Sequence, residues 1–255
     1  MVGRLEGKVA LVSGAANGIG AAVARGFASE GARLCLSDIH AENLAVTAKE
    51  IEADGGAITT LVGDASDPRF VADWVDQAVD RLGRIDVLYN NVGVSRPGLV
   101  GDISDDDWRL QQRLTLDSVF YATRAVLPQM VRQRAGSIVS MSSGAGIGGQ
   151  YELGGYAAAK AGVINLMETV AMEYGPIGIR ANAVTPGPTA TAPLLAYLEG
   201  QPGGVAAHTR GLDLQRLSQP DEVANTVLWL ASDESSNITG ICVRSNIRAA
   251  GSRPF

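Results

Sequence analysis

Tyr156 and Lys160, four residues apart, are the side chains in this sequence best suited to proton chemistry. The surrounding pattern predicts a helix over residues 156–174, in which positions i and i+4 share a face. A free tyrosine has a pKa of about 10, but an adjacent cation stabilises the phenolate and lowers that pKa. We expect Lys160, helped by an oxidised nicotinamide, to bring the pKa of Tyr156 into the range where general acid/base catalysis works. An ordinary solvated Tyr–Lys pair is the alternative.

Ser143 is the third candidate catalytic residue. It follows a strand predicted over residues 137–141, and the carboxyl ends of strands are where open α/β sheets build their sites. Ser143 can donate a hydrogen bond there to a substrate oxygen whose proton Tyr156 exchanges. A loop serine that caps its own backbone is the alternative.

A glycine-rich turn near the N-terminus indicates a dinucleotide site. A strand predicted over residues 9–12 leads into Ser13-Gly14-Ala15-Ala16-Asn17-Gly18-Ile19-Gly20, which opens a helix predicted over residues 18–30. Gly14 suits the tight turn, Gly18 the close approach of backbone N–H groups to a pyrophosphate, and Gly20 the packing of helix on strand. A turn that merely joins strand to helix is the alternative, because such motifs give many false positives.

Asp38 ends the next predicted strand, at the distance where a carboxylate accepts hydrogen bonds from the adenine ribose hydroxyls. A carboxylate there repels a 2′-phosphate, and neither Ile39 nor His40 supplies a cation for one. The sequence therefore favours NAD over NADP. The alternative role for Asp38 is the N-cap of a helix predicted over residues 41–53.

Short apolar runs alternate with segments of helical period along the chain, which is typical of a parallel sheet covered on both faces. We predict one α/β domain over residues 1–255, a doubly wound parallel β-sheet of the Rossmann type with about seven strands and helices on both faces. The predicted strands are 9–12, 33–37, 57–62, 86–89, 137–141, 180–184 and 241–243, and the helices are 18–30, 41–53, 68–82, 105–131, 156–174 and 221–231. Residues 186–219, rich in Pro and Gly, are predicted to be an irregular, mobile cover over the site.

The composition argues against several classes of protein. A net charge of -6 without a basic run argues against a nucleic-acid surface, and no apolar stretch is long enough for a signal peptide or a membrane span. Two histidines and two cysteines give neither a zinc site nor a disulfide framework. We therefore expect a cytoplasmic protein with no metal, nucleic-acid or membrane partner.

Together these motifs resemble the short-chain dehydrogenase/reductase family, in order and spacing over nearly the whole chain. The resemblance implies that Ser143 positions the carbonyl or hydroxyl, that Tyr156 is the acid/base, and that Lys160 also holds the nicotinamide ribose. It also implies a homotetramer or homodimer. The further cofactor contacts that it implies are Ile39, Asp64, Ala65, Asn91, Val92, Gly93, Pro186, Gly187, Thr189 and Thr191.

The sequence departs from the family pattern at two places. Seven positions beyond Trp108, where the family carries an Asn that anchors a relay water, this chain has Thr115, so we expect an impaired or rerouted proton relay. Ser245-Asn246-Ile247-Arg248 replaces the usual Val-Asp-Gly-Gly. We expect this second change to affect assembly or substrate entry more than hydride transfer.

The expected reaction is the interconversion of a secondary alcohol and a ketone, with Tyr156 exchanging the hydroxyl proton while hydride passes to NAD. Apolar residues in the expected substrate wall favour a hydrophobic or bulky substrate. They are Ile147, Leu153, Leu194, Leu195, Tyr197 and Leu198. The alternatives are a 3-oxoacyl reductase acting on carrier-protein or CoA thioesters, a catalytically weak NAD-binding protein on account of Thr115, and a non-redox lyase or epimerase.

Overall fold

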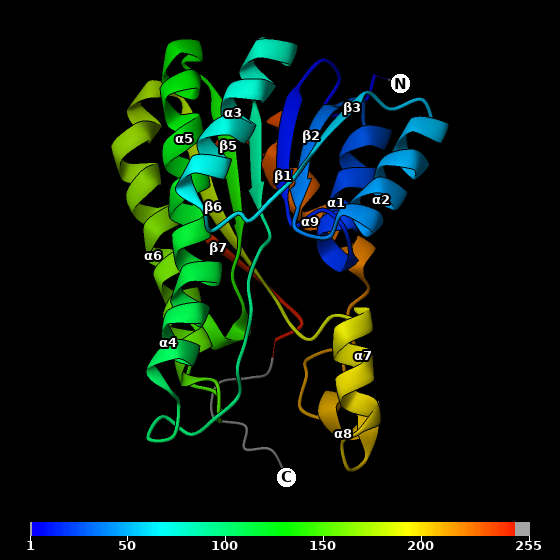
Figure 1. Ribbon diagram of the computed structural model, residues 1–255, viewed down its shortest axis with the longest axis vertical. Helices are drawn as coiled ribbons and strands as arrows, with labels where there is room; N and C mark the ends of the chain where they lie inside the picture. The colour runs from blue at the N-terminus through cyan, green and yellow to red at the C-terminus, as the bar shows by residue number, and fades with distance from the viewer. Residues whose placement is uncertain (1, 248–255) are drawn as a thin grey trace.

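Seven parallel strands form the sheet at the centre of the computed structural model, which describes residues 2–247 (Figure 1). Their order, β3-β2-β1-β4-β5-β6-β7, reverses direction between β1 and β4. This arrangement confirms the predicted doubly wound fold. The strands are β1 (Val9–Ser13), β2 (Arg33–Asp38), β3 (Ile58–Val62), β4 (Val87–Asn90), β5 (Gly136–Met141), β6 (Ile179–Pro186) and β7 (Cys242–Ser245).

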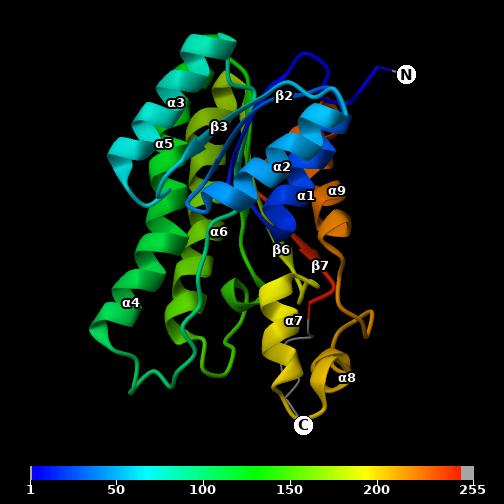
Figure 2. The same ribbon diagram turned by 45° about the vertical axis from the view of Figure 1, so that its right-hand side comes forward.

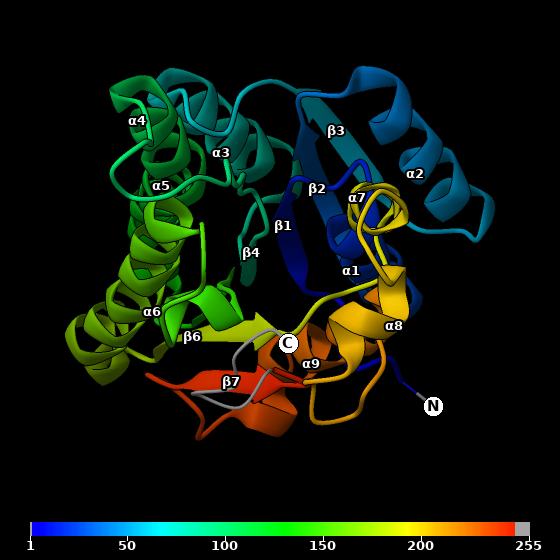
Figure 3. The same cartoon turned by 90° about the horizontal axis from the view of Figure 1, so that it is seen from below.

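Helices cover both faces of the sheet (Figure 3). The strands are apolar on both faces: Ala10 and Val12 of β1 pack into one core, and Val9 and Leu11 pack into the other. The helices of the first layer are α1 (Gly18–Ser29), α2 (Ala41–Ala53) and α9 (Pro220–Ala231). Those of the second layer are α3 (Pro68–Leu82), α5 (Ser118–Gln133) and α6 (Gly154–Tyr174).

The single helix predicted over residues 105–131 is interrupted. The structure has α4 (Asp105–Gln112), then a π-helical turn over Arg113–Asp117, then α5, which ends at Gln133. A π turn inserts one extra residue into the helical repeat and often marks a functional site. Thr115 lies in its middle, fully buried.

The prediction of an irregular segment over residues 186–219 was wrong in part, because two short helices lie within it. They are α7 (Ala192–Glu199), which has a proline in its first turn, and α8 (Gly204–Thr209). Both project from the same end of the molecule as α4 (Figures 1 and 2). The covering segment of the site is therefore built partly from regular structure.

Within residues 2–247, no helix has both the length and the apolar character needed to cross a membrane. Over the same range, no cluster of three or more His, Cys, Asp or Glu side chains is arranged to hold a metal ion. The two cysteines, Cys35 and Cys242, are both free thiols.

Two glycines of α1 should respond oppositely to replacement by alanine. A Cβ on Gly20 would lie 1.9 Å from the carbonyl oxygen of Gly14, whereas a Cβ on Gly26 would meet nothing within 4 Å. We expect Gly20→Ala to lower the free energy of unfolding by roughly 1–3 kcal/mol through overpacking. Gly26→Ala should raise it by up to about 1 kcal/mol, because alanine is the better helix former. Urea unfolding of both variants measures this, and equal effects would contradict the close packing of Gly20.

Candidate active site

A cavity of about 2150 Å³ lies at the carboxyl ends of the strands. The residues that follow six successive strands, β1 to β6, all contribute to its lining: Gly14, Ile39, Gly63, Asn91, Ser142 and Gly187. In open α/β sheets, ligands bind at this edge, where the strand order reverses. The fold therefore brings the predicted site residues to one place.

The glycine turn has the backbone that a phosphate cradle needs. Gly14 and Gly18 have φ values of 66° and 55°, in the left-handed region that favours glycine. Asn17, the N-cap of α1, makes no side-chain capping hydrogen bond, so its side chain does not cover the amides of the first turn. Asn17, Gly18 and Ile19 line the cavity, whereas Gly20 packs behind the turn against Gly14. These residues fit a dinucleotide pyrophosphate.

Asp38 is bound to the glycine turn. Its carboxylate accepts hydrogen bonds from the backbone N–H of Ala16 at 2.9 Å and of His40 at 2.9 Å. The alternative role as N-cap of α2 does not hold, because the N-cap position is His40. Asp38 and Ile39 both line the cavity. The carboxylate is thus fixed in the wall with its charge unpaired by Lys or Arg among the described ion pairs.

Asp64 and Ala65, predicted to lie near the adenine, also line the cavity. The Asp64 carboxylate accepts hydrogen bonds from the backbone and hydroxyl of Ser66, at 2.8 and 2.7 Å, and from Arg113 at 3.1 Å. Burial raises the pKa of Asp64, but these hydrogen bonds outweigh burial and hold the pKa below its usual value. Arg113, which the sequence analysis did not single out, ties the π turn to this end of the cavity.

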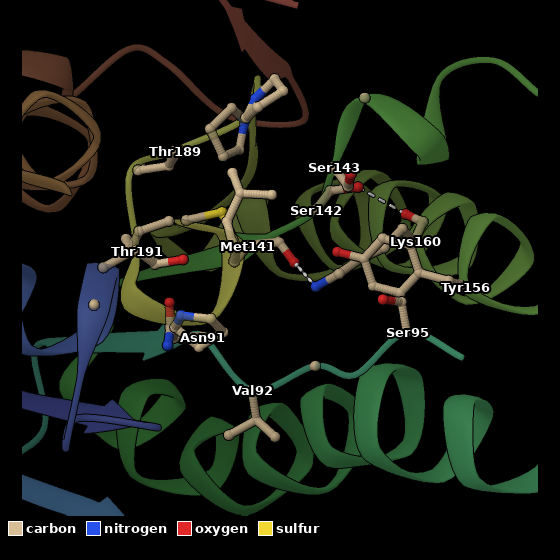
Figure 4. Close-up of a pocket in the computed structure, with 18 of the residues that line it drawn as sticks. Asn91, Val92, Ser95, Met141, Ser142, Ser143, Tyr156, Lys160, Thr189 and Thr191 are labelled. Atoms are coloured by element: carbon tan, nitrogen blue, oxygen red, sulfur yellow. Dashed lines mark hydrogen bonds between the residues drawn. The ribbon is translucent and has the colours of Figure 1, made fainter. Parts of the chain in front are cut away.

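Ser143, Tyr156 and Lys160 line the cavity together (Figure 4). The Lys160 ammonium is buried, lies 5.7 Å from the centre of the Tyr156 ring, and donates a hydrogen bond of 2.6 Å to the carbonyl oxygen of Met141. Ser143 accepts a hydrogen bond of 3.3 Å from the backbone N–H of Ala145, and its hydroxyl lies near enough to Tyr156 to lower the pKa of that residue. The backbone cap is therefore present, and the predicted role of Ser143 toward a substrate oxygen beside Tyr156 stays a prediction.

Burial dominates the electrostatics of this group. It raises the pKa of Tyr156, although the nearby Ser143 hydroxyl acts in the opposite direction, and it lowers the pKa of Lys160 to about 7. Burial therefore sets the pKa of Tyr156 in the free protein, and the expectation that Lys160, helped by an oxidised nicotinamide, lowers that pKa stays a prediction. A lysine with this pKa is only partly charged near neutral pH, so further positive charge is needed to stabilise a phenolate.

Thr115 does not line the cavity. Its hydroxyl accepts a hydrogen bond from the Val94 N–H at 3.2 Å and donates one to the Val94 carbonyl at 3.3 Å. A Cβ on Gly93 would lie 3.1 Å from Lys160 Nζ and 3.6 Å from the methyl group of Thr115. Thr115 therefore supports the chain beneath Gly93, and its hydroxyl is already committed to Val94.

The segment after β6 crosses the glycine turn. A Cβ on Gly18 would lie 3.1 Å from the methyl group of Thr191, and the Thr189 hydroxyl donates to the Gly187 carbonyl at 3.0 Å. The other predicted cofactor contacts of this part, Asn91, Val92, Gly93 and Pro186, line the cavity as well. The prediction of a shared site at these strand ends is thus consistent with their positions.

The substrate end of the cavity agrees partly with the predicted wall. Ile147, Leu153, Leu194 and Tyr197 line it, whereas Leu195 and Leu198 do not; Leu198 is buried in the protein interior. Sequence reasoning missed several lining residues, because nothing in their local pattern marks them. These are Met141, Tyr151, His208, Leu212 and Arg244. Arg248, singled out with Ile247, lies outside the described residues.

Comparisons with known proteins agree with this geometry. A family model described as enoyl-(acyl carrier protein) reductase matches residues 14–246. A 3-oxoacyl-[acyl-carrier-protein] reductase FabG of Thermotoga maritima is 43% identical over 93% of this chain and 95% of its own. Levodione reductase superposes with a TM-score of 0.92 at 30% identity, covering 95% of this chain and 97% of that one. Carveol dehydrogenase from Mycobacterium avium in complex with NAD gives 0.89 at 33% identity, covering 95% and 97%.

Because Lys160 is buried, we expect its replacement to increase the free energy of unfolding by an amount that depends on pH. Because its pKa is about 7 in the folded protein against 10.5 for an ordinary lysine, the unfolded chain binds more protons between these values. Burying the charged form of Lys160 destabilises the folded protein most below about pH 7. This destabilisation decreases as the pH rises toward 10.5. We expect Lys160→Met to increase stability relative to wild type more at about pH 6 than at about pH 9, by on the order of 1–3 kcal/mol.

Urea unfolding at the two pH values measures that difference. Lys49→Met, at an exposed position on α2, is the matched control and should show no such pH dependence. The same stability change for Lys160→Met at both pH values would refute the lowered pKa.

Proposed function

Because this chain belongs to the short-chain dehydrogenase/reductase family and is an NAD(P)-dependent oxidoreductase acting on CH–OH groups, we propose that it interconverts a hydrophobic secondary alcohol and its ketone, with NAD as the preferred cofactor. The whole chain would act as one catalytic domain. The observation that carries the proposal is the placement of Ser143, Tyr156 and Lys160 in the same cavity as the glycine turn.

The chain's own residues would divide the work as follows. The glycine turn and Asp38 hold the dinucleotide, which when bound supplies the hydride acceptor or donor. Ser143 donates a hydrogen bond to the substrate oxygen, and Tyr156 takes the hydroxyl proton in oxidation or returns it in reduction. Lys160 lies close enough to the Tyr156 ring to favour the phenolate while its own charge is present.

Burial in the free protein favours the protonated form of Tyr156. That form is ready to act as the acid in ketone reduction. Alcohol oxidation needs the phenolate, so it requires positive charge beyond that of a lysine with a pKa of about 7. A bound oxidised nicotinamide carries such a charge. Activity in the oxidation direction should consequently depend more steeply on pH than ketone reduction.

A 3-oxoacyl reductase is the second candidate, favoured by the relative from Thermotoga maritima named above. A long acyl thioester fits a cavity of this size, and its reduction uses the same proton chemistry. The catalytically weak alternative has its own support in Thr115, which lies outside the cavity lining and whose hydroxyl donates its one proton to the Val94 carbonyl. Turnover measured with secondary alcohols and with 3-oxoacyl thioesters distinguishes the alcohol dehydrogenase, the 3-oxoacyl reductase and the catalytically weak protein.

We also propose a homotetramer or homodimer that uses the outer faces of α5 and α6. Phe120 on α5 is partly exposed and stacks against Arg124 at 4.9 Å, and Met172 on α6 is strongly exposed. Exposed apolar side chains on neighbouring helices are typical of a subunit interface.

Tyr156→Phe tests the catalytic assignment. Removing the hydroxyl removes the proton carrier but keeps the ring, so we expect kcat to fall at least about 100-fold while NAD still binds. The assay follows NADH formation from a panel of secondary alcohols, with NAD binding measured by calorimetry. Tyr151→Phe, at an exposed tyrosine of the same cavity, is the control and should retain activity. Unchanged turnover by Tyr156→Phe would refute the assignment.

Asp38→Asn tests the cofactor preference. The amide oxygen can still accept from one of the two backbone N–H groups that bind Asp38, and the side chain loses the negative charge that repels a 2′-phosphate. We expect the ratio of kcat/KM for NAD to that for NADP to fall about tenfold or more. Asp76→Asn, on the exposed face of α3, should leave the ratio unchanged. A wild type that prefers NADP would overturn the role given to Asp38.

A further inference from the structure

The last residues that the structure describes, at the end of β7, lie at the cavity. β7 pairs with β6 up to the register of Ser245 with Pro186, and the Gly187 N–H donates to the Ser245 carbonyl at 2.8 Å. Asn246 and Ile247, which follow, both line the cavity. The family motif has aspartate and glycine at these two positions, so a branched apolar side chain here is a property of this chain.

Asn246 fixes the direction of the backbone before Ile247. Its φ of 47° is left-handed, a conformation that asparagine tolerates better than most residues, and its side chain is 9% exposed. The amide oxygen accepts a hydrogen bond from Leu214 N–H at 2.9 Å, and the amide nitrogen donates to the Arg216 carbonyl at 2.8 Å. It lies 3.3 Å from the Ser218 hydroxyl as well. Asn246 therefore locks the end of β7 to the segment between α8 and α9.

The other side of Asn246 is equally confined. A Cβ on Gly187 would lie 1.8 Å from the Asn246 carbonyl oxygen, so the two backbones are already in contact. Neither the chain after β6 nor the segment before α9 leaves room for Asn246 to shift. The position of Ile247 is thus fixed from both sides.

Ile247 lies against the residue that follows Ser143. Its Cγ2 and Cβ atoms are 3.6 and 3.8 Å from the position that a Cβ on Gly144 would occupy. A β-branched side chain has few rotamers and cannot swing aside easily. Ile147 and Leu194 are further apolar residues in the lining of the same cavity.

We propose that Ile247 limits the size of the substrate group that lies on the Ser143 side of the reacting carbon, and that Asn246 is the positioning residue that holds it there. This inference rests on the proposed function only because it assumes that a substrate group occupies the space beside Ile247. Whether Ile247 limits that space can be tested without measuring turnover.

The first experiment measures access to position 143 directly. In a Ser143→Cys background, the rates of modification by methyl and benzyl methanethiosulfonate are followed by mass spectrometry of the peptide that contains residue 143. We expect Ile247→Ala to raise the benzyl-to-methyl rate ratio about tenfold or more, and Ile247→Val to give a smaller rise. Ile241→Ala, a replacement of the same size at a residue that is 40% exposed and outside the cavity, should leave the ratio unchanged.

The second experiment measures specificity in the otherwise unaltered protein. We expect Ile247→Ala to shift the ratio of kcat/KM for 1-phenylethanol to that for 2-butanol about tenfold toward the larger alcohol, with the KM for NAD unchanged. If Ile247→Ala leaves the benzyl-to-methyl labelling ratio unchanged, Ile247 does not limit access to position 143. If it leaves the alcohol ratio unchanged in an active enzyme, Ile247 does not determine substrate specificity. A shifted labelling ratio in a protein that oxidises no alcohol supports this limit on access and counts against the proposed function instead.

Discussion

The side chain of Asn91 joins the two halves of the sheet at the point where the strand order reverses. Its amide nitrogen donates to the Gly14 carbonyl at 3.0 Å, its amide oxygen accepts from the Tyr89 hydroxyl at 3.1 Å, and its backbone N–H donates to the Ser13 hydroxyl at 3.3 Å. The glycine turn comes from β1 and the catalytic residues follow β5, so their relative position depends on how β1 and β4 are held together. The Asn91 bonds add to the pairing of β1 with β4 at the strand ends where the cavity lies.

Two helices, α2 and α3, have the bounds that the sequence predicted, and α3 carries clear local start and stop signals. The bounds predicted for α3 are the observed ones, because the Asp67 carboxylate caps its first turn, Pro68 begins it, and Gly83 adopts the left-handed conformation that ends it. Strand β1 was found because it is apolar and buried on both faces, and the glycine turn was found because its backbone conformation needs glycine. Local chemistry of this kind is visible in the residue types themselves.

The features that were missed depend on contacts between distant parts of the chain. The π turn has no pattern of its own, since the apolar period simply continues from α4 into α5. The acceptor for Lys160 is a backbone carbonyl, that of Met141, which any residue at that position would supply. Asn246 was noticed only as a departure from a family pattern, and its three partners lie 28 to 32 residues away in the chain. Position in the fold, not residue type, gives these groups their roles.

The π turn limits where residues can be inserted into or deleted from this chain. Arg113 at its start reaches Asp64 on one side of the molecule, and Thr115, two residues later, reaches Val94 on another. Deleting one residue from the turn would rotate α4 by about 100° relative to α5 and would separate at least one of these pairs. Insertions and deletions should therefore accumulate in the exposed residues near Gly101, before α4, and be excluded from residues 113–117.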